Sequence, residues 1–218
     1  MTEHVLPFTG GVGGATFRMS SDNLHRLFYN SLQFDGNSTK AFLYVPQSKG
    51  LYMNTSDGQV YIEDCAFGCE WESGEETVFL IDGKNAKFVE EFLRKAVGEL
   101  QVNILSDGHL VLNADRPEGN PEEQKAWVSI SYGEWVAQSE LFEEEGHENG
   151  SLTFAINPDR LRKLSLLQPR DYPVDIKIRR LFETGQDVLL FKKGPRLRGV
   201  YGTLDYDLIQ EEGNEHLW

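Results

Sequence analysis

The stretch TVFLIDGKNAKFVEEFLRKA, residues 77–96, decides the fold. It opens with an apolar, β-type run and continues with apolar residues that recur at helical spacing, so a strand leads directly into an amphipathic helix. We predict the helix over residues 84–97, with Phe88, Val89, Phe92, Leu93, Ala96 and Val97 on its apolar face. Three extended segments follow, at 100–106, 109–114 and 125–132.

The same order of elements occurs three times, over residues 16–67, 77–135 and 152–206. In the first copy, a strand at 16–19 precedes a predicted helix at 20–33 and three strands within 41–67. In the third, Asn157 is the predicted N-cap and Pro158 the first residue of a helix that ends near 167. A repeated unit of roughly fifty residues does not usually bury its apolar face alone, so the copies are expected to pack side by side.

These units suggest a division of the chain. We predict a flexible glycine-rich arm over 1–15, a first unit with its connector over 16–76, one domain made of the second and third units over 77–206, and an acidic tail over 207–218. The acidic segments 68–76 and 138–150 are predicted to be connectors. The tail, which ends in Leu217 and Trp218, is either disordered or docks its apolar end into a groove.

Composition is that of a soluble globular protein, with 39% apolar and 26% charged residues. No run reaches the roughly 18 apolar residues that span a bilayer, and residues 1–14 lack the features of a secretory signal, so we expect a cytoplasmic protein without membrane contact. Cys65 and Cys69 have no second pair of Cys or His at ligand spacing, and neither a disulfide nor zinc is expected. No cofactor is predicted.

The distribution of charge differs from the net charge of −14. The three helical stretches 20–33, 84–97 and 157–167 together hold eight Lys and Arg residues against four Asp and Glu residues, so they are positive within an acidic chain. In the second helix, Lys84, Lys87, Arg94 and Lys95 are predicted to form one stripe opposite the Phe88 and Phe92 face. Such a stripe either follows a phosphate backbone or is a solvated helix face.

A second basic cluster lies on the predicted strands of the third unit. Its members are Lys177, Arg179, Arg180, Lys192, Lys193, Arg196 and Arg198. The two-residue period of a strand places Lys177 and Arg179 on one face of the sheet. This cluster could bind DNA, bind a neighbouring acidic surface, or bind nothing.

Catalysis is not favoured by the motifs. The five histidines are dispersed, none stands beside a plausible nucleophile, and no G-x-S-x-G, H-E-x-x-H or Walker pattern occurs. A site assembled from distant residues would escape this test. We therefore expect a binding protein rather than an enzyme.

The repeated units resemble those of DNA sliding clamps, the ring-shaped processivity factors of replicative polymerases. Residues 77–96, VNILSDGHLVLNAD and KAWVSISY resemble the penultimate unit of a bacterial β clamp. SLTFAINPDRLRKLSLL, VDIKIRR, DVLLFKKG and RGVYGTLDY resemble its last unit. The resemblance implies an α+β DNA-clamp fold of repeated β-α-β-β-β units, with antiparallel sheets outside and helices lining a central hole.

The resemblance also implies a function and its residues. The chain would be a phage or bacterial DNA polymerase processivity factor that encircles duplex DNA as a homo-oligomer, without reading its sequence, and tethers a polymerase. A clamp loader is a further partner that the resemblance suggests. The implied DNA-facing residues are Arg26, Lys84, Lys87, Arg94, Lys95, Arg160, Arg162 and Lys163. Clamps bind partners in an apolar cleft near the last strand, and Val200, Tyr201 and Leu204 are the candidates here.

The number of units sets this chain apart from familiar clamps. Rings of that family contain twelve units, shared among two or three subunits, so four copies of a three-unit chain would be needed to close one. Alternatively, the N-terminal region contains a degenerate unit, or the protein does not close a ring. Two other functions stay open: a clamp-like or DNA-mimicking protein that inhibits or recruits a nucleic-acid-binding partner, and an enzyme whose site is not visible in the sequence.

Overall fold

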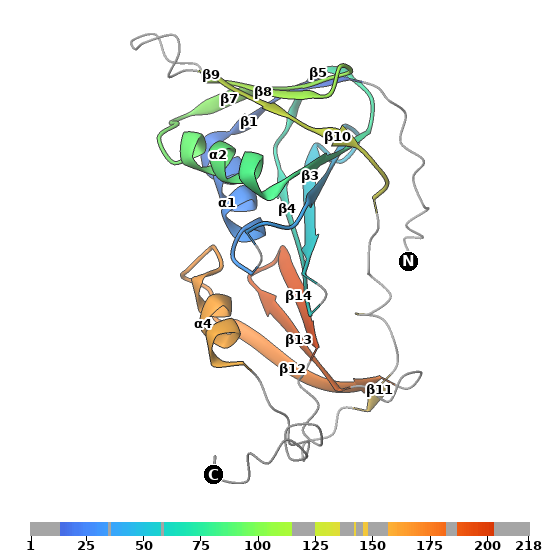
Figure 1. Ribbon diagram of the computed structural model, residues 1–218, viewed down its shortest axis with the longest axis vertical. Helices are drawn as coiled ribbons and strands as arrows, with labels where there is room; N and C mark the ends of the chain where they lie inside the picture. Colours follow the sequence, from blue (N-terminus) through green and yellow to red (C-terminus); the bar gives the residue numbers. More distant parts are fainter. Residues whose placement is uncertain are drawn as a thin grey trace.

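The computed structural model describes residues 14–34, 36–57, 59–114, 125–135, 142, 146–147, 157–181 and 187–202. It is a mixed α+β structure of two antiparallel sheets and three helices within these ranges (Figure 1). The helices are α1 (Ser21–Ser31), α2 (Gly83–Leu93) and α4 (Pro158–Leu166). Each falls within three or four residues of its predicted range.

The strands of the first two units follow in chain order. They are β1 (Ala15–Ser20), β2 (Lys40–Val45), β3 (Gly50–Ser56), β4 (Val60–Phe67), β5 (Glu70–Gly74), β6 (Thr77–Ile81), β7 (Glu99–Leu105), β8 (His109–Ala114), β9 (Lys125–Ser129) and β10 (Ser131–Tyr132). The remaining strands are β11 (Gly146–His147), β12 (Val174–Leu181), β13 (Asp187–Lys193) and β14 (Leu197–Gly202). The first strand predicted for the third unit, 151–156, lies outside the described residues, as do the arm 1–13 and the tail 207–218.

The first two units exchange their first strands. β1 of the first unit pairs with β7 of the second, and β6 of the second pairs with β2 of the first. One five-stranded sheet, in the order β5-β1-β7-β8-β9, and part of a nine-stranded sheet result from this exchange. A single apolar core then fills the space between both sheets, α1 and α2, with Phe17, Phe28 and Phe42 at its centre.

The third unit extends the nine-stranded sheet, whose order is β10-β6-β2-β3-β4-β14-β13-β12-β11. β14 pairs with β4, and Leu164, Leu167 and Phe191 form a second core that also takes in Val60 and Ile62 of β4. In the structure, strand exchange joins the first unit to the second. The predicted division of the chain, which grouped the second unit with the third, stays a prediction.

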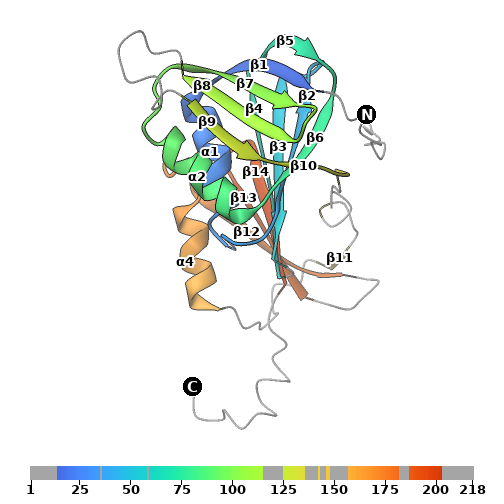
Figure 2. The same ribbon diagram turned by 45° about the horizontal axis from the view of Figure 1, so that its top comes forward.

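All three helices lie on the same side of the nine-stranded sheet, and the five-stranded sheet lies over α1 and α2 (Figures 1 and 2). We call the helix-covered face of the nine-stranded sheet its inner face and the opposite one its outer face. Alternation along β4 directs Asp64 to the inner face, where it meets α1, and therefore directs Glu63, Cys65 and Phe67 to the outer face.

The predicted connector 68–76 is wrong over β5. Residues 70–74 form a strand that pairs with β1 at the edge of the five-stranded sheet. All five of its residues are exposed. The sequence EWESG has neither the apolar alternation nor the β-branched residues that indicate a strand, so the pattern gave no sign of it.

The described residues contain no helix long and apolar enough to cross a membrane. Cys65 and Cys69 form no disulfide, and no group of three or more metal-ligating side chains is found within the described ranges.

Candidate nucleic-acid interface and groove

Arg26 is buried between α1 and β4 rather than exposed on the helix. Its Nη1 donates to both carboxylate oxygens of Asp64, at 2.5 and 2.6 Å, and its Nη2 donates to the carbonyl of Cys65. Asn30, one turn further along α1, donates to the same carboxylate at 2.8 Å. A side chain committed to this buried ion pair cannot reach DNA, so the structure corrects the placement of Arg26 on a DNA-facing surface.

The basic stripe of α2 is exposed, but its position relative to the apolar face differs from the prediction. The buried residues are Ala86, Val89, Glu90 and Leu93, which pack toward α1 and β9. Phe88 is 51% exposed and Val97 is 70% exposed, so neither belongs to the core. Because residues four apart share a helix face, Phe88 lies beside Lys84 rather than opposite it.

Contacts at the α1–α2 junction fix Arg94. Its Nη2 lies 2.6 Å from Glu90 Oε2, and the other carboxylate oxygen of Glu90 lies 3.0 Å from His25 Nε2. Burial raises the pKa of Glu90, but the hydrogen bonds and charges of Arg94 and His25 outweigh it and hold the pKa below its usual range. Glu90 therefore joins the two helices through His25, and Arg94, whose side chain is 64% exposed, pairs with it from the same helix.

Lys84 and Lys87 of α2 are exposed, and so is Lys95 in the turn after the helix. Lys87 Nζ donates to Asn37 Oδ1 at 3.2 Å, in the segment between α1 and β2. The helix surface of the first two units therefore presents ammonium groups on long flexible stems. Such groups suit contacts to phosphates that do not depend on sequence.

The cations of α4 separate into two kinds. Arg160 Nη1 pairs with Asp57 Oδ2 at 2.5 Å, and Lys163 Nζ donates to the carbonyl of Phe34 at 3.2 Å, so both tie the third unit to the first. The side chain of Arg162 is 64% exposed and lies 3.9 Å from Asp159. Of these three predicted residues, Arg162 is the one whose charge faces outward.

The Arg160–Asp57 ion pair gives a pH-dependent prediction. Burial raises the pKa of Asp57, but Arg160 and the backbone N–H groups of Val60 and Gln59 outweigh it and lower the pKa overall. Replacing Asp57 with Asn keeps the oxygen that accepts those N–H groups and removes the charge. We expect D57N to lower the free energy of unfolding by about 1–2 kcal/mol at pH 7.

The sign of the pH effect follows from the lowered pKa. A carboxyl with a depressed folded-state pKa stabilises the protein above its unfolded pKa of about 3.9, and this stabilisation is lost as the pH falls through the folded value. Urea unfolding at several pH values should therefore show the wild-type advantage disappearing below about pH 4. E70Q, on the exposed strand β5, is the control, and an advantage that persists in strong acid would contradict the assignment.

The outer face carries most of the second basic cluster. Register places Lys177, Arg179, Lys192 and Arg198 on that face, and Arg196 belongs to the turn between β13 and β14. Lys193 differs, because it is buried on the inner face, where its Nζ donates to the carbonyl of Ser165 near the end of α4. Burial lowers the pKa of Lys193.

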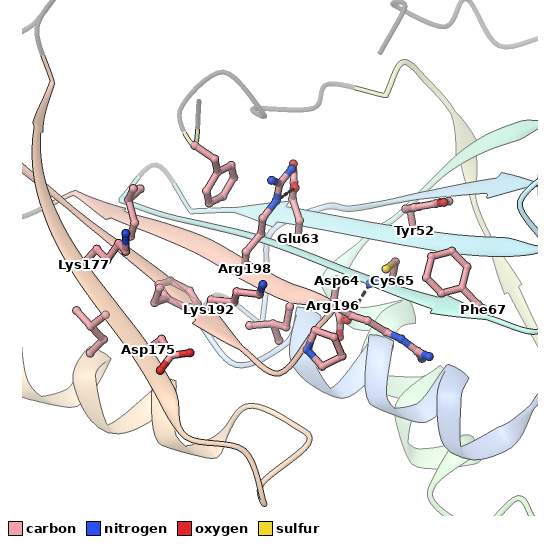
Figure 3. Close-up of a pocket in the computed structure, with 16 residues that line it drawn as sticks. Tyr52, Glu63, Asp64, Cys65, Phe67, Asp175, Lys177, Lys192, Arg196 and Arg198 are labelled. Atoms are coloured by element: carbon pink, nitrogen blue, oxygen red, sulfur yellow. Dashed lines mark hydrogen bonds and ion pairs between the residues drawn. The ribbon is translucent and has the colours of Figure 1, made fainter. Parts of the chain in front are cut away.

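A groove of about 900 Å³ crosses the outer face where β4 meets β14. Figure 3 shows Lys177, Lys192, Arg196 and Arg198 around it, with Tyr52 and Phe67 toward one end. Arg198 Nε pairs with Glu63 Oε2 at 2.8 Å, and the Arg196 guanidinium lies over the Phe67 ring, 5.4 Å from its centroid. The groove thus combines cations with aromatic surface.

The predicted partner-binding residues do not form one cleft. Val200 is buried on the outer face, in a small apolar patch with Val188 and Leu190 beside the groove. Tyr201 points to the inner face and belongs to the second core, so the structure does not place it in a surface cleft. Leu204 lies outside the described residues.

Phe142 is a residue of the groove that sequence reasoning missed. Its ring packs against the Val188, Leu190 and Val200 patch and lies 4.2 Å below the Arg198 guanidinium. The carbonyl of Phe142 accepts a hydrogen bond from Arg179 Nη1 at 3.4 Å. The available signal was one aromatic residue inside an acidic segment, which indicates an anchor only when the opposing surface is known.

No protein-family model matches the sequence, and no curated protein matches it. Solved structures do match. The match to a putative DNA polymerase III beta subunit from Eubacterium rectale covers 92% of this chain and 68% of that subunit, with 11% sequence identity and a TM-score of 0.56. The match to the DNA polymerase III beta chain from Streptococcus pneumoniae covers 88% of this chain and 65% of that one, with 12% sequence identity and a TM-score of 0.58. The match to the Helicobacter pylori beta clamp covers 90% of this chain and 67% of that one, with 11% sequence identity and a TM-score of 0.57.

These similarities show the fold of a DNA sliding clamp, and they confirm the predicted α+β fold class. The chain spans about two thirds of the length of the clamps that it matches. Identity near one residue in nine means that the likeness concerns the arrangement of the elements and not the residues of a site.

Proposed function

We propose that this protein is a sliding clamp that holds DNA against its helix side and tethers a DNA polymerase to it, without catalysing a reaction. The observation that carries the proposal is the exposed charge of the helices. In a chain of net charge −14 with the sliding-clamp fold, Lys84, Lys87, Lys95 and Arg162 face outward from the helix side of the nine-stranded sheet. Electrostatic attraction of this kind is independent of sequence and sensitive to salt.

Assembly into a ring is the second part of the proposal. Three units per chain require four copies for a twelve-unit ring, and strands at sheet edges offer backbone groups through which copies could pair. β9 lies at one edge of the five-stranded sheet, and its Trp127 is 53% exposed. The same proposal includes a clamp loader that places the ring on DNA.

Retention on circular DNA tests the proposal. A closed ring on a nicked circular duplex should resist a wash with 1 M salt, in which the Debye length is about 3 Å. Cutting the circle once should release it, because a linear duplex has ends. Retention that does not depend on circularity, or light scattering that gives a monomer at micromolar concentration, would overturn the ring. Displacement of DNA from another protein would instead favour the DNA-mimic function.

A further inference from the structure

The third unit exposes apolar side chains on the inner face of the nine-stranded sheet. Leu164 is the one buried residue of α4, whereas Leu161 of the same helix is 43% exposed. On β12, Ile176 is also 43% exposed, and register pairs it with Phe191 of the second core, so it lies on the inner face. Ile178 follows on the same face, two residues later. Apolar surface of the kind that the first two units bury is therefore open to solvent in the third.

The exposed apolar side of α4 faces away from the first unit. With about 3.6 residues per turn, Arg160 and Lys163 lie to one side of Leu164, and both tie the helix to the first unit. Leu161 and Ser165 lie to the other side and are exposed. We call the side with Leu161 and Ser165 the far flank of α4. It is directed toward the end of the sheet where β12 lies, because β4 of the first unit is at the opposite end of the third unit.

The first two units show how such a surface is covered. α1 packs against α2, and each unit gives its first strand to the sheet of the other, so that both contribute to one core. The third unit joins the first in another way, edge to edge along β4 and β14. A repeated unit usually needs a neighbour to bury its apolar face. The far flank of α4 therefore lies where a paired unit would pack its helix.

We infer that this place is taken by the third unit of a second copy of the chain, so that the two far flanks pack against each other around a two-fold axis. Leu161 of one copy covers Ile176 and Ile178 of the other, and the symmetry repeats the contact in the reverse direction. The flank residues Leu161 and Ser165 carry no charge, so two identical flanks meet without repulsion. Arg162, one position along the helix, is directed away from the sheet and stays outside the contact.

This pairing sets the symmetry of the proposed ring. Two copies of a three-unit chain contain six units, and two such pairs complete twelve. The ring then has two kinds of two-fold contact, one between third units and one between β9 edges, whereas a head-to-tail ring repeats a single kind. The inference rests on the proposed function for the ring. The pairing of two copies is nevertheless measured without DNA, so the two proposals can fail separately.

Light scattering by the full chain at micromolar concentration tests the pairing through variants that each break one contact. L161E puts a carboxylate into the far flank, and W127E puts one on the β9 edge. If wild type is a tetramer, each single variant should halve the mass to that of a dimer, and L161E/W127E should give monomers. V97E introduces the same charge at an exposed apolar residue after α2, and this control should leave the mass unchanged.

The outcomes separate the pairing from the ring. A wild-type dimer that L161E alone makes monomeric supports the pairing, although the ring fails. Single variants that both reduce a tetramer to monomers show a head-to-tail ring and contradict the pairing. A wild-type monomer, or an L161E variant with the mass of wild type, also contradicts it.

A cross-link gives a second test that does not depend on breaking a contact. Near a two-fold axis, the same residue of two copies comes close, so S165C on the far flank should form a disulfide with itself under mild oxidation. A non-reducing gel should then show a covalent dimer of the full chain. V97C and wild type, whose Cys69 is buried and Cys65 half-buried, are the controls. The pairing is wrong if S165C cross-links no more than V97C does.

Discussion

The D64A variant is expected to lose about 3–5 kcal/mol of its free energy of unfolding, because the substitution leaves the buried guanidinium of Arg26 without its counter-charge. Asp64 is fully buried on β4, where its carboxylate accepts from Arg26 at 2.5 and 2.6 Å and from Asn30 at 2.8 Å. Burial raises the pKa of Asp64, and the contacts from Arg26 and Asn30 oppose that rise. Urea unfolding followed by circular dichroism measures the loss.

The hydrogen bonds around Asp64 extend beyond Arg26, and this adds to the expected loss of stability. Asn30 also accepts from the backbone N–H of Gln168 and donates to its carbonyl, so Asp64 helps to orient a residue that connects α1 with the loop after α4. E70A, on the exposed strand β5, is the control and should stay within about 0.5 kcal/mol of wild type. The double variant R26M/D64L should recover part of the loss, since apolar residues replace the buried ion pair but remove the partners of the Asn30 amide N–H and the Cys65 carbonyl.

Removing four exposed cations from the helix side should weaken DNA binding strongly. In K84A/K87A/K95A/R162A, the logarithm of the affinity for duplex DNA should fall less steeply with the logarithm of salt concentration, by up to about 3.6 in slope. The affinity near 100 mM salt should fall by about tenfold or more for the same reason. Arg94 is left in place, because its removal would also take a counter-charge away from the buried carboxylate of Glu90.

The outer face supplies the matched control. K177A/K192A/R196A removes three exposed cations from the groove on the outer face, and it should keep the wild-type affinity and salt dependence of DNA binding. The helix-side variant should lose DNA affinity. If its processivity and its DNA affinity match those of wild type, the helix side does not contact DNA, and the mimic or enzyme functions gain support.

Periodicity predicted the elements well where packing decides the residue types. Leu24, Leu27 and Phe28 recur at helical spacing and are buried, and the extended stretch DVLLFKK, residues 187–193, forms β13. The side of α2 that packs was harder to predict, because Glu90 is buried through its contacts with His25 and Arg94 while Phe88 stays exposed. A single-helix pattern contains no information about such partners.

The candidate sites show the same limit. Counting cations along a helix could not separate Lys84, which is exposed, from Arg26, which is neutralised by a residue 38 positions away. The basic cluster of the third unit was visible in the sequence, whereas its assembly with Phe67 and Phe142 depends on the pairing of β4 with β14. Contacts between distant segments also decided which units exchange strands.

The seam between β4 and β14 also has a mechanical consequence. Four consecutive residue pairs join the two strands, from Arg198–Glu63 to Tyr201–Val60, and the Arg160–Asp57 and Arg198–Glu63 ion pairs fasten its two ends. Separating the strands at this seam would break backbone hydrogen bonds of a continuous sheet, so we expect the three units to move together as one rigid body. If four copies form a ring, we therefore expect it to open where one copy meets the next.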